Sequence, residues 1–269
     1  MVGITKSIAV FGGNGFLGKR ICEQGIRSGY NVISLTRSGI APKIESHHDA
    51  HWISKVQWKK ADLLDPKTYK EALGEVDTVV HSVGMLFEDQ QYKKVMNSNP
   101  SIPDLLKLIK GGNPMAKDSK TTYESIQRDS AVIIADAFLK ENSKKKNKSL
   151  SYVYISADKL PPFIPAGYIN TKREAEVALS SKPGLRTILM RPGIMSDETE
   201  SLTSHRNKIT SLLSYVYGAK ESIFGKNVPF LNANIRPSVS TQQVSRKIFE
   251  KLEDSNFSGV VLLEDIATK

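Results

Sequence analysis

The sequence contains one cysteine, few aromatic residues (7%) and no hydrophobic run as long as a membrane-spanning helix. A single cysteine, Cys22, excludes an internal disulfide framework and is typical of a protein in a reducing compartment. The histidines at 47–51 have no cysteine near them, so no metal site is predicted. Without a stretch of about 20 apolar residues, no transmembrane helix is expected. Since the first apolar run begins near Ser7, no cleavable presequence is expected either.

The sequence has fewer acidic than basic residues: 28 Asp and Glu compared with 38 Lys and Arg, which gives a formal net charge of +10. Such a charge favours solubility, or residence in a compartment that is alkaline or rich in anionic lipids. Nucleic-acid binding is not predicted, because no basic stripe interleaved with aromatic residues accompanies the charge. With 269 residues, 39% of them hydrophobic, the chain could hold one or two domains and can bury a substantial core. We predict a single domain that spans residues 1–269.

A glycine-rich turn follows the first apolar run, and a helix-like pattern follows the turn. Gly12 permits a tight turn, Gly15 leaves room for a pyrophosphate, and Gly18 lets the helix pack close to a sheet. Phe16 and Leu17 lie in the same turn, and we predict that they also contact a bound dinucleotide cofactor. The N–H groups at the start of the helix favour phosphates. The segment predicts a dinucleotide-binding site.

Apolar, β-branched runs recur along the chain and are mostly separated by segments long enough for a helix. This pattern predicts successive β-α-β units, and hence an α/β protein with a Rossmann-type, doubly wound parallel sheet. The predicted strands are Ile8–Phe11, Val32–Leu35, Val56–Trp58, Thr78–His81, Tyr152–Ile155, Thr187–Met190 and Gly259–Leu263.

Two segments interrupt this alternation of predicted strands and helices. Residues 87–120 are polar and rich in proline and glycine, and they are predicted to form a long insertion that serves as a lid or a partner surface. Residues 196–236 are predicted to form a small C-terminal helical lobe on the substrate side. After this lobe, Ser240 and Gln243 have the spacing of a capping box, which predicts the start of a helix.

Three residues that follow or end predicted strands are candidate cofactor ligands. Arg37 lies where an NAD site usually has an acidic residue, and its charge suits a ribose 2′-phosphate, so NADP(H) is predicted over NAD(H). An ordinary surface arginine is the alternative. Asp62 either accepts a hydrogen bond from the adenine amino group or caps the next turn. His81 is a candidate to line the nicotinamide pocket.

Tyr168 and Lys172 stand four residues apart in a segment of good helix formers, which places both side chains on one helical face. A phenol has a pKa near ~10, and a neighbouring ammonium lowers it, so Lys172 could tune Tyr168 as a proton donor. Lys172 could also bind a cofactor ribose. Ser156 ends a predicted strand, where its hydroxyl could polarise a substrate carbonyl. Ser156, Tyr168 and Lys172 are the predicted catalytic residues.

Several of these residues together resemble the short-chain dehydrogenase/reductase superfamily, in its extended or atypical branch. The resemblance covers nearly the whole chain and rests on the glycine turn, Asp62, Ser156, Tyr168–Lys172 and Arg191–Gly193. It implies a Rossmann fold, an NAD(P) cofactor and a Ser–Tyr–Lys catalytic set. The active-site amide of the superfamily has no clear counterpart, and Gln127 is only a loose candidate for it.

Within that branch, residues 10–22, 154–159, 167–176 and 236–245 are similar to fungal mitochondrial proteins of coenzyme Q biosynthesis, themselves related to the NADPH-binding accessory subunit of respiratory complex I. This similarity implies a reductase-like protein that acts on a quinone-ring intermediate. It also implies ubiquinone-biosynthesis proteins as partners, on the matrix side of the inner mitochondrial membrane. A non-catalytic dinucleotide-binding scaffold is the alternative, and a redox sensor is a third reading.

Overall fold

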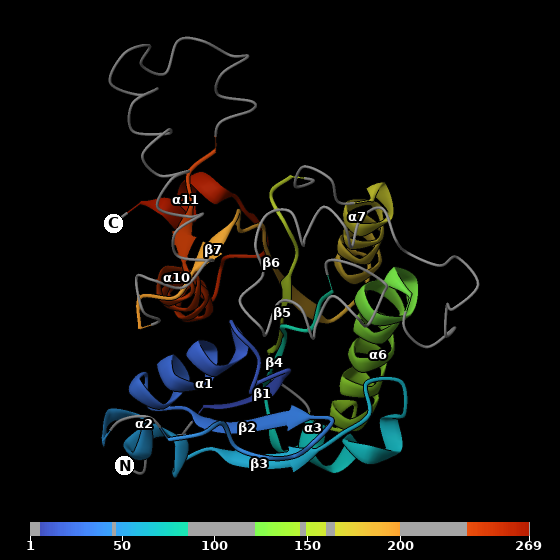
Figure 1. The fold of residues 1–269 in the computed structure, drawn as a ribbon. Helices are drawn as coiled ribbons and strands as arrows, with labels where there is room; N and C mark the ends of the chain where they lie inside the picture. Colours follow the sequence, from blue (N-terminus) through green and yellow to red (C-terminus); the bar gives the residue numbers. More distant parts are fainter. Residues whose placement is uncertain are drawn as a thin grey trace, which may run out of the picture.

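A computed structural model describes residues 6–44, 47–85, 122–145, 149–159, 165–199 and 236–268. In this part of the chain, seven parallel strands form one sheet in the order β3-β2-β1-β4-β5-β6-β9 (Figure 1). The chain begins at β1, winds outward to β3, and then returns to build the other half from β4 onward. The strand order reverses between β1 and β4, and ligands of such folds bind at the carboxyl edge of the sheet at this reversal.

The strands and helices have the following bounds. The sheet consists of β1 (Ser7–Phe11), β2 (Asn31–Thr36), β3 (Gln57–Lys60), β4 (Thr78–His81), β5 (Leu150–Ile155), β6 (Leu185–Met190) and β9 (Gly259–Val261). Two short strands, β7 (Met195–Ser196) and β8 (Val239–Ser240), pair separately in a parallel orientation. The α-helices are α1 (Gly18–Arg27), α2 (His47–Ile53), α3 (Lys70–Glu75), α6 (Ser130–Asn142), α7 (Ala166–Ser180), α10 (Thr241–Glu253) and α11 (Leu263–Ala267).

The predicted fold class is confirmed, and every predicted strand is present with ends that differ by a few residues. The last strand is shorter than predicted because Leu263 already belongs to α11. The capping box is also present: the Ser240 hydroxyl accepts a hydrogen bond from the Gln243 N–H (3.0 Å), and the Gln243 side chain accepts one from the Ser240 N–H (2.7 Å). These two bonds satisfy N–H groups that the first turn of α10 would otherwise leave unpaired.

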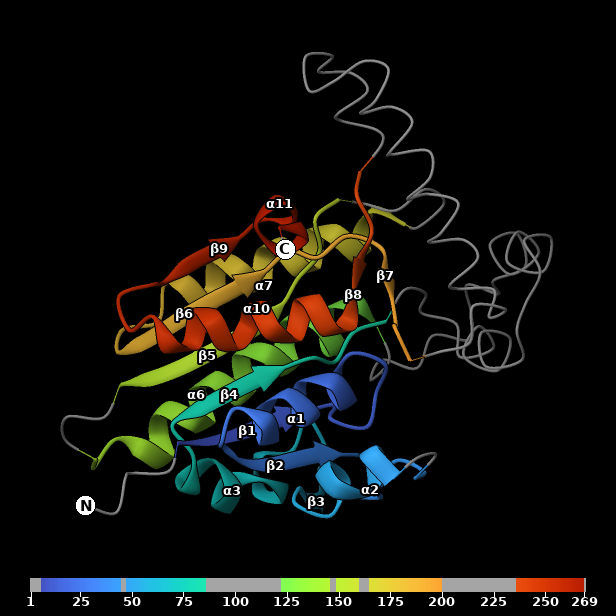
Figure 2. The same ribbon diagram turned by 90° about the vertical axis from the view of Figure 1, so that its left-hand side faces the viewer.

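The sheet is covered on both faces, as Figure 2 shows with α1 and α10 before it and α6 and α7 behind it. Alternate residues of β1 divide between the two resulting cores. Ile8 and Val10 pack in the core under α1 and α10, whereas Ala9 and Phe11 pack in the core under α3, α6 and α7. Burial on both faces explains why the central strands are continuous apolar runs without alternating polar residues.

Two predicted features lie largely outside the described residues: the insertion at 87–120 and the helical lobe at 196–236. The single-domain organisation therefore stays a prediction. Among the helices that the structure describes, none is both long enough and apolar enough to cross a membrane.

Candidate functional site

The glycine turn between β1 and α1 is packed too tightly for side chains at three of its positions. Gly12 has a φ of +85°, a conformation that L side chains rarely adopt. A Cβ on Gly13 would lie 2.2 Å from the Ser34 hydroxyl oxygen, and one on Gly18 would lie 2.0 Å from the carbonyl oxygen of Gly12. The turn can close in this form only with glycine at these places.

Gly15 differs from its neighbours because it is exposed, and only the carbonyl oxygen of Gly12 lies within 4 Å of a Cβ built on it. Its backbone is therefore open to an approaching ligand. The first turn of α1 contains no acidic residue, so the positive end of the helix dipole is not neutralised there. An exposed glycine before such a helix start is suited to an anionic pyrophosphate. The predicted roles of Phe16 and Leu17 stay predictions.

The turn after β2 lies against the glycine turn. The Asn14 side-chain amide donates to the Ser38 hydroxyl (3.4 Å) and to the carbonyl oxygen of Ile40 (3.3 Å), which links the two turns. Arg37 is exposed at this edge and has no ion-pair partner within the described residues. Asp62 is exposed after β3, and its carboxylate accepts a hydrogen bond from the Leu64 N–H (3.0 Å). That bond is the turn-capping role that the sequence left open for Asp62.

Tyr168 and Lys172 both lie on the buried face of α7, as their spacing predicts. The Lys172 ammonium donates to the carbonyl oxygen of Ile155 at the end of β5 (2.7 Å), and it lies 5.5 Å from the centre of the Tyr168 ring. Burial lowers the pKa of Lys172 to about 7, although Glu176 acts in the opposite direction. Lys172 can therefore both hold a positive charge and release a proton near neutral pH.

The ring of Tyr168 is held by apolar neighbours. It packs with Met85, Tyr123 and Ala157, and the Tyr123 ring meets it edge-on at a centroid distance of 6.1 Å. Ala157 follows Ser156 at the end of β5, so this packing brings Tyr168 to the same strand end as the predicted serine. The structure thus places the three predicted catalytic residues around the carboxyl end of β5.

Ser156 is held by charged side chains. The Arg173 guanidinium donates to the Ser156 hydroxyl oxygen (3.0 Å) and forms an ion pair with Glu176 (2.6 Å). Burial alone would raise the pKa of Glu176, but hydrogen bonds from Arg191 and Ser156 and the charge of Arg173 hold it below its usual value. The hydroxyl of Ser156 is therefore engaged on both its donor and its acceptor side.

His81 is placed differently from its prediction as a pocket-lining residue. Its ring is fully buried, and its Nε2 atom lies 2.9 Å from the Ser130 hydroxyl of α6. Burial and the charge of Lys172 lower the pKa of His81 to about 3, so the imidazole is neutral at physiological pH. This position lies beneath the strand end, inside the core under α6, and does not favour direct contact with a cofactor.

Gln127, absent from the predicted site, reaches the Tyr168–Lys172 pair from a π-helical segment, Glu124–Asp129. The Gln127 amide nitrogen donates to the Thr171 hydroxyl (3.3 Å), and its amide oxygen is buried without a hydrogen-bond partner in the described structure. A Cβ on exposed Gly84 would lie 3.6 Å from the Lys172 ammonium and 3.9 Å from this oxygen. An unpaired acceptor, a cation and an open backbone thus meet at the end of β4, which suits a polar ligand group. The sequence offers Gln127 only as a loose counterpart of the superfamily's active-site amide, because a π-helical turn has no sequence signature of its own.

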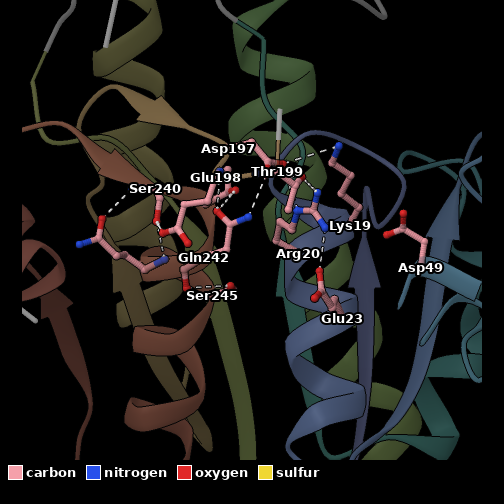
Figure 3. A network of polar contacts seen from close by, with 12 residues as sticks. Lys19, Arg20, Glu23, Asp49, Asp197, Glu198, Thr199, Ser240, Gln242 and Ser245 are labelled. Carbon is pink, nitrogen blue, oxygen red and sulfur yellow. Dashed lines mark hydrogen bonds and ion pairs between the residues drawn. The ribbon is translucent and has the colours of Figure 1, made fainter. Parts of the chain in front are cut away.

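A second polar cluster joins the first turn of α1 to the C-terminal part of the chain (Figure 3). Asp197 is fully buried, and it accepts hydrogen bonds from Arg20 (3.0 Å) and from Gln242 of α10 (2.8 Å). Lys19 lies 3.6 Å from the same carboxylate. Burial alone would raise the pKa of Asp197, but hydrogen bonds from Thr199, Arg20 and Gln242 lower it to about 2. The helix that begins at the glycine turn is therefore fixed to α10 through one carboxylate.

Comparisons with known proteins agree with this geometry. Residues 8–99 match the NAD-dependent epimerase/dehydratase family. MIOREX complex component 2 of Saccharomyces cerevisiae is 43% identical over 274 residues, which cover 98% of this chain and 99% of that protein. The chain belongs to the NAD-dependent epimerase/dehydratase family. It is thus an NAD(P)-binding protein of the extended short-chain dehydrogenase/reductase type, as the superfamily-level resemblance implied.

Solved structures share the fold of this family member. A 3-oxoacyl-[acyl-carrier protein] reductase from Brucella melitensis in complex with NAD has a TM-score of 0.62 at 15% identity, over 98% of each chain. An ElxO variant with NADPH bound has a TM-score of 0.61 at 16% identity, over 98% of this chain and 100% of that one. At such identities the likeness shows the fold alone.

The narrower resemblance to coenzyme Q biosynthesis proteins requires correction. The yeast relative, which is 43% identical over 98% of this chain, is described as a component of the MIOREX complex and not as an enzyme of ubiquinone synthesis. The implied quinone-ring substrate and ubiquinone-biosynthesis partners are therefore unsupported. Short matching segments such as the glycine turn are dictated by cofactor binding and packing, so they identify the superfamily better than the pathway.

Proposed function

We propose that this family member is an NADP(H)-dependent reductase-type protein. The observation that carries the proposal is the Tyr168–Lys172 pair, buried at the carboxyl end of β5 beside the open backbone of Gly84 and on the same sheet edge as the glycine turn. A bound nicotinamide cofactor would supply hydride to a carbonyl substrate. Tyr168 donates a proton to the alkoxide oxygen that develops, and Lys172 favours the phenolate left behind.

The residues around this edge divide the remaining tasks. Gly12, Gly15 and Gly18 hold the pyrophosphate, and Lys172 binds the ribose next to the nicotinamide. Gln127 adds a buried amide oxygen that can orient a polar group near Lys172. Ser156 polarises the substrate carbonyl only after its hydroxyl turns away from Glu176, because both of its hydrogen-bonding directions are engaged.

We propose a preference for NADP(H) because Arg37 is exposed and has no ion-pair partner within the described residues. A charge-assisted contact to the 2′-phosphate is worth about 1.5–3 kcal/mol, or about tenfold to a hundredfold in affinity. Arg37→Ala should therefore weaken NADPH binding by that factor and leave NADH binding nearly unchanged. Calorimetric titration with both cofactors measures this difference, and equal losses for the two would remove Arg37 from the role.

The second candidate is a cofactor-binding component of a mitochondrial complex that performs no chemistry. Two observations favour it: the Ser156 hydroxyl is engaged by Arg173 and Glu176, and the yeast relative is named as a MIOREX complex component. On this reading the dinucleotide stabilises the fold and the surface that meets MIOREX partners. A mitochondrial location belongs to both candidates.

Tyr168→Phe separates the two candidates. The substitution preserves the ring packing and removes the proton donor, which should lower turnover by about 10²–10⁴-fold. The readout is NADPH oxidation against a panel of ketones and aldehydes, with NADPH affinity measured in parallel. Tyr30→Phe is the matched control. Tyr30 precedes the first residue of β2, so it lies at the amino edge of the sheet, away from the carboxyl edge that carries Tyr168. If Tyr168→Phe leaves turnover at the wild-type level, or if the wild type oxidises no NADPH with any substrate of the panel, the non-catalytic candidate replaces the reductase.

A further inference from the structure

Lys60 ends β3 directly beside the turn that carries Arg37. The two neighbouring strands place Lys60 in register with Thr36, the last residue of β2. Gly39 adopts a φ of +66°, and a Cβ on it would lie 2.8 Å from the Lys60 nitrogen and 3.0 Å from the Lys60 Cβ. The turn after β2 therefore lies against Lys60, with only a hydrogen atom of Gly39 between the two backbones.

The strand alternation fixes which face Lys60 occupies. Trp58 packs into the core on the side of α1 and α2, and residues two apart in a strand share a face. Lys60 therefore lies on the α1 side of the sheet, the side of the glycine turn. Lys59 lies on the opposite side, where its ammonium is 3.8 Å from the carboxylate of Glu75 in α3.

Three groups around this turn are left with unused hydrogen-bond donors. Arg37 and Lys60 are exposed, and the structure gives neither an ion-pair partner among the residues it describes. The Ser38 hydroxyl oxygen accepts from Asn14 (3.4 Å) and from the Ile40 N–H (3.2 Å), so both of its lone pairs are used and its O–H remains to donate. Two cations and a hydroxyl donor match the oxygen acceptors of a phosphate dianion.

We infer that Lys60 is the second cation, together with Arg37, of a subsite for the ribose 2′-phosphate, with Ser38 as the hydroxyl donor. This inference rests on the proposed NADP(H) function and assigns a specificity-determining residue to it. Such a subsite explains why a lysine without a partner ends β3, whereas the adjacent lysine is paired with Glu75.

The test compares Lys60→Ala with Lys59→Ala, which removes the same charge from the neighbouring residue on the other face. Both variants are titrated calorimetrically with NADP⁺ and NAD⁺ at low and moderate salt. Lys60→Ala should weaken NADP⁺ binding by about tenfold and leave NAD⁺ binding within twofold, because one exposed charge-assisted contact is lost. Its NADP⁺ affinity should also depend less steeply on salt. Lys59→Ala should bind both cofactors like the wild type.

Adenosine 2′,5′-bisphosphate and adenosine 5′-monophosphate serve as independent probes, since only the first has a 2′-phosphate. Lys60→Ala should lose affinity for the bisphosphate alone, and Lys60→Arg should restore it. Equal losses for both nucleotides, or an equal effect of Lys59→Ala, would overturn the role of Lys60. A wild-type protein that binds neither dinucleotide would instead overturn the proposed function. Circular dichroism spectra of all variants distinguish a lost contact from a lost fold.

Discussion

The glycine turn and the region around Ser156 occupy the same edge of the sheet but are built in opposite ways. At the turn, space is kept by the absence of side chains, and a Cβ at Gly13 or Gly18 would lie 2.2 Å or less from another atom. Around Ser156, space is filled by charged partners, with Arg173 and Arg191 both bound to the buried carboxylate of Glu176. A steric clash is not relieved by a change of pH or salt. The stability of a charge network, in contrast, changes with pH, with salt and with conservative substitution.

The largest effect is expected from Gly18→Ala, which breaks the sterically defined region. Its methyl group would lie 2.0 Å from a backbone oxygen that cannot move without opening the turn. We expect a loss of about 3 kcal/mol in the free energy of unfolding, at the upper end for overpacking, together with loss of cofactor binding. Urea denaturation measures the first effect, and calorimetry the second.

Gly74→Ala is the control for this prediction. Gly74 lies inside α3, and no atom is within 4 Å of a Cβ built on it, so alanine should stabilise the helix by about 0.5–1 kcal/mol. If Gly18→Ala is as harmless as Gly74→Ala, the turn is not closed in the way described.

Gly15→Asp sharpens the comparison, because Gly15 is the exposed glycine of the turn. A Cβ at this position would lie 3.1 Å from the carbonyl oxygen of Gly12, so the turn must shift slightly, and the new carboxylate stands where an anionic pyrophosphate would bind. The free protein should therefore lose only a little stability compared with the wild type. A cofactor at a hundred times its dissociation constant adds about 2.7 kcal/mol of stability to the wild type, and the variant should lose this gain entirely. Thermal unfolding with and without NADPH checks both statements, and a cofactor-dependent shift that persists in Gly15→Asp would contradict the pyrophosphate position.

Glu176→Gln tests the charged region. The carboxylate is buried, but its partners Arg173 and Arg191 have side chains 31% and 26% exposed, so water offsets part of their unpaired charge. We expect destabilisation of about 2 kcal/mol, below the range for a fully buried pair. Glu174→Gln, two residues away and 52% exposed, should change the free energy of unfolding by less than about 0.5 kcal/mol. If Glu176→Gln and Glu174→Gln lower the free energy of unfolding equally, burial of the carboxylate does not determine how much it stabilises the fold.

The smallest effect, per pH unit, is expected from the titration of Lys172. Burial lowers its pKa from 10.5 to about 7 in the folded chain, so the unfolded chain binds more protons between these two values. The contribution of Lys172 to stability therefore rises as the pH increases from about 7 to 10.5, by at most about 1.4 kcal/mol per unit. Lys172→Met removes this contribution. In urea denaturation, the free energy of unfolding of the wild type minus that of the variant should therefore increase as the pH rises from about 7 to 10.5, and a constant difference would contradict the lowered pKa.

The two regions also differ in how much the sequence predicts. The strands and the glycine turn follow from local pattern, because period, turn chemistry and missing side chains are all visible in a short window. Contacts across the fold are not visible in a short window: Arg191, directly after β6, meets Glu176 of α7 only once the sheet has formed. His81 ends a strand that is buried throughout, so no alternation of polar residues indicated which face it occupies. The π-helical turn that presents Gln127 depends on packing and has no pattern of its own.

The carboxylate of Asp197 has a consequence for the order of folding. It joins Arg20 to Gln242, so the cofactor helix near the N-terminus receives part of its support from a helix close to the C-terminus. Contacts of such long sequence separation form late, because the intervening loop must close first. During synthesis, the glycine turn therefore emerges early from the ribosome but lacks its final support until α10 has followed. A nascent chain should therefore acquire full dinucleotide affinity only after α10 has emerged and packed against α1.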